Sequence, residues 1–111
     1  MDALVDEVVV PADEMADSAR AACEFLKAMS HETRLRVLCF LMEGEKSVSE
    51  LEQSLGIRQA SVSQQLQRLR AERMVTTRRD GKAVYYSLAS NDAREVIAVL
   101  YKLFCADKKC L

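Results

Sequence analysis

The stretch that decides the fold is "SVSELEQSLGIRQASVSQQLQRLRAERMVTTRRDGKAVYYSL", residues 47–88. At its start, Ser47 and Glu50 stand three residues apart, which is the spacing of a capping box that opens a helix. Gly56 is a typical helix stop, so this first helix is predicted to be short. After a brief turn, a longer helix is predicted over about residues 59–73, because apolar side chains recur there at helical spacing.

The hydrophobic pattern then changes from a helical period to that of strands. The segments "MVTTRR" and "AVYYSLA" are rich in β-branched and aromatic residues, and "DGK", residues 80–82, joins them as a tight hairpin signal. Two helices joined by a short glycine-containing turn and followed by a basic hairpin predict a winged helix-turn-helix.

Three further helices are predicted around this unit, over about residues 13–29, 31–43 and 91–105, and Ser30 is the expected cap of the second. The fold class is therefore mainly α with a small β-hairpin wing, and it contains five helices. The expected domain organisation is a flexible acidic N-terminal segment over residues 1–13, one domain over residues 14–105, and a C-terminal tail over residues 106–111.

Composition supports one small globular domain. The chain has 111 residues, of which 50% are hydrophobic and 30% charged, with a net charge of −1. No run approaches the roughly 18 apolar residues of a membrane span. The N-terminal stretch is acidic and has no basic region typical of a signal peptide, so a cytoplasmic location is expected. In that setting four cysteines do not indicate a disulfide framework.

The charge distribution is more informative than the net charge. Residues 58–82 hold seven basic side chains and two acidic ones. Such a run is often only a solvated face, but its position on the predicted helix and wing favours DNA binding. The start of the second helix of a helix-turn-helix reads base edges in the major groove, and a basic wing suits phosphates or the minor groove. The predicted DNA-binding residues are Arg58, Gln59, Ser61, Ser63, Gln64, Gln65, Arg68, Arg78, Arg79 and Lys82.

The segment "FLKAMSHETRLRVLCFL", residues 25–41, followed by residues 47–88, resembles the ArsR/SmtB family of winged-helix repressors. The resemblance extends over roughly residues 20–105. It implies a homodimer formed through the first and last helices, with one recognition helix from each subunit on half of a near-palindromic double-stranded operator. It also implies that an inducer weakens DNA binding. Two positions depart from the family pattern, since Gln65 stands where many members have His and Arg73 where many have Gly.

The metal sites of this family are missing from the sequence. One site type uses a "CVC" run, but this chain has Ser47 and Ser49 in its place, and the last helix contains no histidine. The only histidine, His31, is interpreted as a residue of the first turn of its helix, near solvent. No metal and no cofactor are therefore predicted, because a zinc site needs several Cys or His ligands.

Two cysteines are the expected sensing residues. Cys39 and Cys105 match the cysteine pair of the sulfide- and persulfide-responsive branch of the family (SqrR/BigR type). The resemblance implies that persulfides join these two thiols through extra sulfur atoms, so that the repressor leaves its operator and genes of sulfide oxidation or detoxification are expressed. Lysines near Cys105 in the sequence would favour its thiolate, and we expect Cys105 to react first.

Other signals and functions remain open at this point. The same repressor could sense peroxide through a plain disulfide, or arsenite or a soft metal through Cys105, Cys110 and Cys23. Cys23 otherwise belongs to the apolar side of the first helix, where packing is its expected role. A thiol enzyme is disfavoured because no C-x-x-C motif occurs, and the basic wing argues against a winged helix that binds only proteins.

Overall fold

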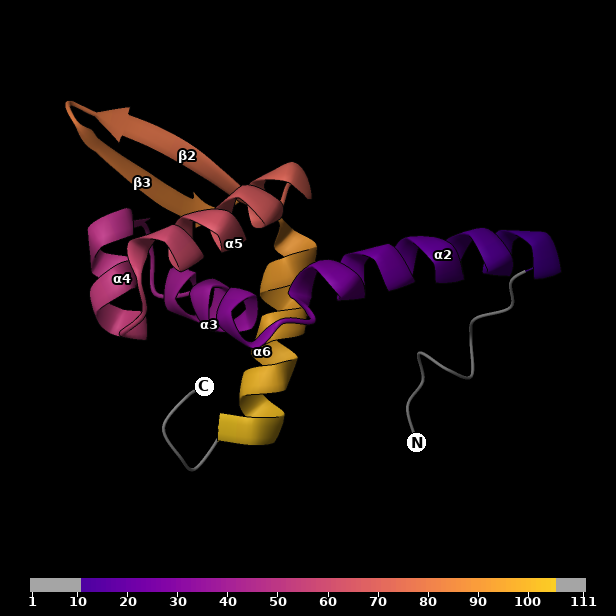
Figure 1. The fold of residues 1–111 in the computed structure, drawn as a ribbon. Helices are drawn as coiled ribbons and strands as arrows, with labels where there is room; N and C mark the ends of the chain where they lie inside the picture. Colours follow the sequence, from indigo (N-terminus) through magenta and orange to yellow (C-terminus); the bar gives the residue numbers. More distant parts are fainter. Residues whose placement is uncertain (1–10, 106–111) are drawn as a thin grey trace.

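The computed structural model describes residues 11–105, which form a helix-rich domain with a small sheet (Figure 1). Its helices and strands are α2 (Ala12–Met29), α3 (Glu32–Leu41), β1 (Lys46–Ser47), α4 (Val48–Leu55), α5 (Gln59–Ala71), β2 (Val75–Asp80), β3 (Ala83–Leu88) and α6 (Asn91–Cys105). Within this range the predicted winged helix-turn-helix and its five helices are confirmed. The predictions for residues 1–10 and 106–111, Cys110 included, lie outside the described residues.

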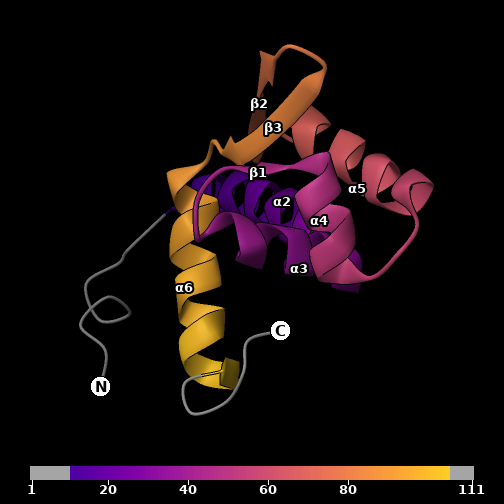
Figure 2. The same cartoon turned by 90° about the vertical axis from the view of Figure 1, so that its left-hand side faces the viewer.

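The wing is a three-stranded antiparallel sheet in the order β1-β3-β2. The hairpin turns at Gly81 and Lys82, and Gly81 has a φ of 65°, which suits the first central position of a II′ turn. The short strand β1 was not predicted. It pairs with β3 through Lys46 opposite Tyr86 and Ser47 opposite Tyr85, and therefore ties the start of α4 to the wing (Figure 2).

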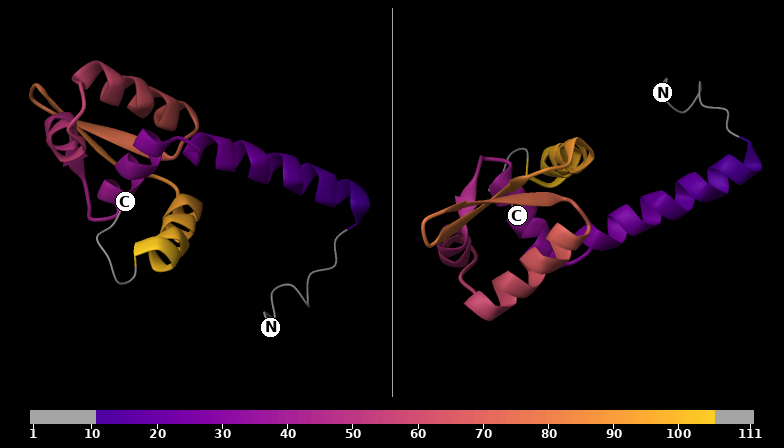
Figure 3. Two further views of the ribbon diagram at one scale, coloured as in Figure 1. Left: turned by 60° about the horizontal axis from the view of Figure 1, so that its bottom comes forward. Right: turned by 90° about the horizontal axis from the view of Figure 1, so that it is seen from above.

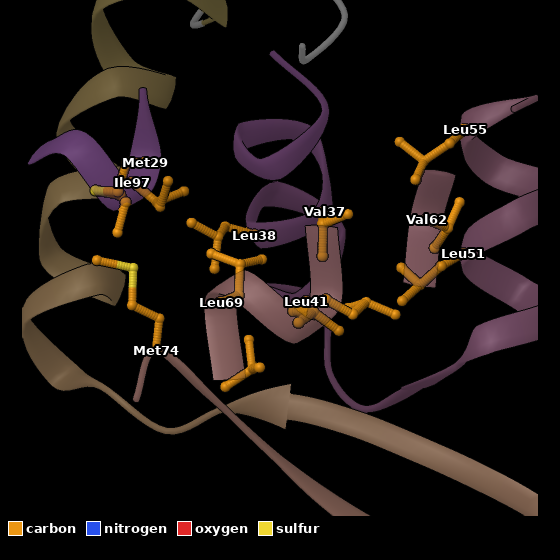
Figure 4. Packing of buried hydrophobic residues seen from close by; sticks show 13 residues of the cluster. Met29, Val37, Leu38, Leu41, Leu51, Leu55, Val62, Leu69, Met74 and Ile97 are labelled. Carbon is orange, nitrogen blue, oxygen red and sulfur yellow. The ribbon is translucent and has the colours of Figure 1, made fainter. Parts of the chain in front are cut away.

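The hydrophobic core lies where α3, α4 and α5 meet and extends to the base of the wing and to α6 (Figure 4). Leu38, Leu51, Val62 and Leu69 are completely buried. The side chains that complete this cluster include Met29, Val37, Leu41, Leu55, Leu66, Met74 and Ile97. This packing holds α4 and α5 together as a unit and leaves the opposite face of α5 in solvent.

Helix α2 projects away from this core (Figure 3). Only its last two residues, Ala28 and Met29, are buried, and Phe25 packs partly against the cluster. The expected packing role of Cys23 is wrong for the single chain, because its side chain is exposed. Among residues 11–105, no other element covers the apolar stripe of α2 before its last turns, so this stripe is open to another molecule.

Helix α5 ends in a Schellman motif that contains a strained residue. The amide of Met74 donates to the carbonyl of Leu69 and that of Arg73 to the carbonyl of Arg70, both at 3.0 Å. Arg73 has a φ of 62°, in the left-handed region that glycine adopts without steric cost. The departure from the family pattern at this position therefore places a residue with a Cβ in a glycine conformation.

The variant Arg73→Gly is expected to raise the free energy of unfolding by about 0.5–1 kcal/mol. Relief of the left-handed strain outweighs the extra entropy that glycine gives the unfolded chain. Urea denaturation checks this. Arg73→Ala removes the same charge and keeps the strain, so equal stabilisation by both variants would assign the gain to charge and contradict the backbone explanation.

Candidate nucleic-acid interface and thiol positions

The two helices of the helix-turn-helix are positioned by local signals in the sequence. The Ser47 hydroxyl accepts from the Glu50 amide at 3.1 Å, and the Glu50 carboxylate accepts from the Ser47 amide at 2.8 Å. This capping box, which the sequence predicted, starts α4. Gly56 ends it in the left-handed conformation with a φ of 67°. The chain then turns within three residues into α5.

The first turns of α5 present polar side chains to solvent. Arg58, Gln59, Ser61 and Gln64 are exposed, and Ser63 is half-buried. Here the structure places five of the predicted DNA-binding residues on an accessible part of the molecule. Their arrangement follows from the helical period, since Val62 and Leu66 on the opposite face are buried in the core.

A polar groove of about 330 Å³ separates this part of α5 from the wing. Ser49 of α4, Gln59 and Ser63 of α5, and Lys82 and Tyr85 of the wing line it. Hydroxyl, amide and ammonium groups from three elements therefore converge on one open channel. Such groups are the usual donors to phosphate oxygens of a nucleic-acid backbone.

The wing cations differ from the prediction in one respect. Arg78 is a partner of Glu45, donating to its two carboxylate oxygens at 2.9 and 2.7 Å, and its guanidinium lies 4.7 Å from the centre of the Tyr85 ring. These hydrogen bonds lower the pKa of Glu45 and raise that of Arg78. Arg79 and Lys82 are exposed at the end of the hairpin. No local pattern in the sequence indicated the pairing of Arg78 with Glu45, because the two residues are 33 positions apart.

Gln65 and Arg68 also lie differently from the other predicted DNA-binding residues. The amide oxygen of Gln65 accepts a hydrogen bond of 2.8 Å from Arg34, which lies in the first turn of α3. Arg68 is 3.4 Å from the carboxylate of Glu72, the C-cap residue of α5. Both side chains therefore make contacts within the chain. The residues at the start of α5 are accessible whether or not these two side chains contact DNA.

Arg34 is the one charged residue that is buried among those described, with 9% of its surface exposed. Besides Gln65, its guanidinium donates to the backbone carbonyls of Ala28 at 2.6 Å and Lys27 at 3.2 Å, both in the last turn of α2. Burial lowers the pKa of Arg34, as does the charge of Arg68, and Glu72 opposes this. An arginine stays charged despite such a shift.

The two thiols of the predicted sensing pair lie on neighbouring helices, since α3 and α6 pack against each other. Cys39 is half-buried at the edge of the hydrophobic cluster. Cys105, the last residue of α6, is only 1% exposed. Because reactivity requires access as well as thiolate, exposure favours Cys39 as the thiol that reacts first, and we revise the expectation that Cys105 does so.

The remaining histidine and cysteine positions give no support to a metal site. His31, and not Ser30 as predicted, caps α3, because its Nδ1 atom accepts from the Thr33 amide at 3.1 Å. Cys23 is exposed on α2. Within residues 11–105, no three Cys, His, Asp or Glu side chains gather closely enough to hold a metal ion. None of the helices in that range has the length and apolarity needed to cross a membrane.

Comparison with known proteins agrees with this geometry. Residues 31–77, which run from α3 into β2, match the family model "Bacterial regulatory protein, arsR family". The "Biofilm growth-associated repressor" of Xylella fastidiosa is 43% identical over 97 residues, which cover 87% of this chain and 85% of that protein.

Two solved structures extend the similarity to the fold. The crystal structure of the transcriptional repressor BigR from Xylella fastidiosa superposes with a TM-score of 0.80 at 42% identity, covering 91% of this chain and all of that one. The solution structure of the homodimeric winged helix-turn-helix DNA-binding domain of Mb0332 from Mycobacterium bovis, a possible ArsR-family regulator, has a TM-score of 0.71 at 26% identity. It covers 86% of this chain and 89% of that one.

Proposed function

The chain belongs to the ArsR family of bacterial regulatory proteins, and on that premise we propose that it is a homodimeric repressor that releases its operator in response to persulfides. The observation that carries the DNA-binding part is the accessible start of α5, which lies across a polar groove from the basic wing. One such unit fits one half-site of a near-palindromic operator. In a two-fold symmetric dimer, the second subunit supplies the unit for the other half-site.

The proposed dimer interface follows from where apolar surface remains exposed. In the described part of the chain, every large hydrophobic side chain that is exposed lies on α2 or α6. These residues are Met15, Leu26, Val99, Tyr101, Leu103 and Phe104. Apolar surface gathered on two helices is typical of an interface with another subunit. The homodimeric state of the Mycobacterium bovis relative supports the same arrangement.

DNA contacts of the wing are assigned to Arg79 and Lys82, and Arg78 is assigned to anchoring. Arg79→Ala and Lys82→Ala are each expected to reduce the salt slope of operator binding by about two units, because each substitution removes one cation from both subunits and each cation releases about one condensed counterion. Arg78→Ala should change the slope less, since Glu45 already neutralises its guanidinium. Affinities measured over a series of salt concentrations test this, and equal slope changes for Arg78 and Arg79 would refute the assignment.

The proposed response to persulfide uses Cys39 and Cys105. The Cys39 thiolate attacks the outer sulfur of a persulfide, takes that sulfur, and releases the donor thiol. The resulting Cys39 persulfide takes one more sulfur from a second donor in the same way. The Cys105 thiolate then attacks the middle sulfur of this three-sulfur chain and displaces hydrosulfide. The product is a three-sulfur bridge between α3 and α6, with no further oxidant needed. The extra sulfur also spans a longer gap than a direct disulfide, whose Cα atoms must lie within about 7 Å.

Such a bridge would link the helix that supports α4 and α5 to a helix of the proposed interface. Two recognition helices must stand about 34–36 Å apart to read two half-sites one DNA turn apart. A change in the angle between the two elements would alter that spacing and weaken operator binding. Because the proposed inducer is a persulfide, we propose that the repressed genes encode functions of sulfide oxidation or detoxification.

An anaerobic binding experiment tests the whole proposal. Operator DNA is first selected from random duplexes with the reduced protein. Glutathione persulfide is then added, and both DNA release and the intact mass of the protein are measured, with glutathione disulfide, peroxide and arsenite in parallel. Release by persulfide alone, with added sulfur joining Cys39 and Cys105, is the expected result. Release by peroxide or arsenite alone would exclude persulfide as the signal.

A further inference from the structure

Arg34 connects two helices to which the proposed function gives different tasks. Its Nε and Nη2 atoms donate to the carbonyls of Ala28 and Lys27 at the end of α2, and its Nη1 atom donates to Gln65 in the middle of α5. The carbonyls of a last helical turn lack partners within the helix and carry partial negative charge. One buried guanidinium therefore caps the proposed interface helix and holds the proposed recognition helix at the same time.

The geometry of this link is rigid. A guanidinium is planar, and its donors point in fixed directions, so three hydrogen bonds from one group define the relative directions of the groups that accept them. The burial of Arg34 keeps water from replacing those acceptors easily. The apolar contacts of α2 with the core are limited to its last turns, since of the buried cluster residues only Ala28 and Met29 belong to α2.

We infer that Arg34 and Gln65 are positioning residues that set the angle between α2 and α5, and through it the spacing of half-sites that the dimer binds. This inference rests on the proposed function. Stability of the subunit does not require the Gln65 hydrogen bond, because Val37 and Leu38 of α3 already pack in the same cluster as Val62, Leu66 and Leu69 of α5. The hydrogen bond from Arg34 to Gln65 fixes the orientation of α5 against α3, whose contact is otherwise apolar.

The test uses Gln65→Met, which keeps the length of the side chain and removes the acceptor. Gln65→Glu keeps an acceptor oxygen and serves as the rescue variant. Gln67→Met, at an exposed position of the same helix, is the matched control. Affinity is measured for three kinds of DNA selected with the wild-type protein: the full operator, a single half-site, and operators with one or two base pairs added or removed between half-sites.

Gln65→Met is expected to lose at least about fivefold of its preference for the full operator over the half-site, and to discriminate less between spacings. Gln65→Glu and Gln67→Met should keep both preferences. An equal loss on full and half-sites, or no loss on either, would overturn the inference. Failure of the wild-type protein to select any DNA would instead overturn the proposed function. Arg34→Met tests the other end of the link where thermal denaturation shows that the variant is folded.

Discussion

Leu103→Glu is expected to convert the protein to monomers and to lower its affinity for a two-half-site operator by about 10²–10⁴-fold, the contribution of linked binding. Leu103 is 68% exposed on α6, beside Phe104 at 63%, and these values are high for large apolar side chains. In the proposed dimer both become buried, and a carboxylate at that position would lose its hydration without gaining a partner. Folding of the subunit should be unaffected, because Leu103 contributes nothing to the core.

Sedimentation measures the oligomeric state, and anisotropy of labelled duplexes measures operator and half-site affinities. Half-site affinity should stay close to that of the wild type, since the start of α5 is untouched. Lys102→Glu is the control, because it places the same side chain one position away without removing apolar surface. A Leu103→Glu protein that remains dimeric and binds the full operator normally would place the interface elsewhere.

The elements that sequence reasoning predicted well depend on short-range signals. The capping box at Ser47 and Glu50, the glycine that ends α4 and the glycine in the wing turn each act within a few residues. The helical period then fixed which face of α5 is apolar. The polar face at the start of α5 was predictable for the same reason, because burial of Val62 and Leu66 leaves the neighbouring polar positions in solvent.

The features that sequence reasoning missed depend on contacts between distant parts of the chain. Strand β1 has two residues and exists only because β3 pairs with it. Arg78 and Gln65 belong to polar segments whose composition is typical of DNA binding. Each instead forms a hydrogen bond within the chain, Arg78 with Glu45 and Gln65 with Arg34, which lie 33 and 31 positions away. Cys23 was expected to pack because helical periodicity identifies an apolar stripe but does not tell whether the same chain or a partner covers it.

Cys39→Ser is expected to bind the operator with an affinity within about twofold of the wild type and to lose persulfide-induced release completely. Typical allosteric coupling lowers affinity by about 5–150-fold, so this loss is readily measured. Serine is close to cysteine in size but cannot take sulfur from a persulfide, so no bridge to Cys105 can form. The side chain at position 39 is half-buried at the edge of the core, where a hydroxyl retains access to water.

The matched control is Cys23→Ser, which removes an exposed thiol on α2 and should keep the full response. The partner thiol is best tested with Cys105→Ala, because a hydroxyl at a site that is 1% exposed would be costly without a hydrogen-bond partner. Operator release with and without glutathione persulfide is measured for all three variants. If Cys39→Ser still releases DNA, the two-thiol bridge is wrong. If Cys23→Ser loses the response, the sensing thiols include Cys23 of α2. A bridge between Cys39 of α3 and Cys105 of α6 is then excluded as the whole signal.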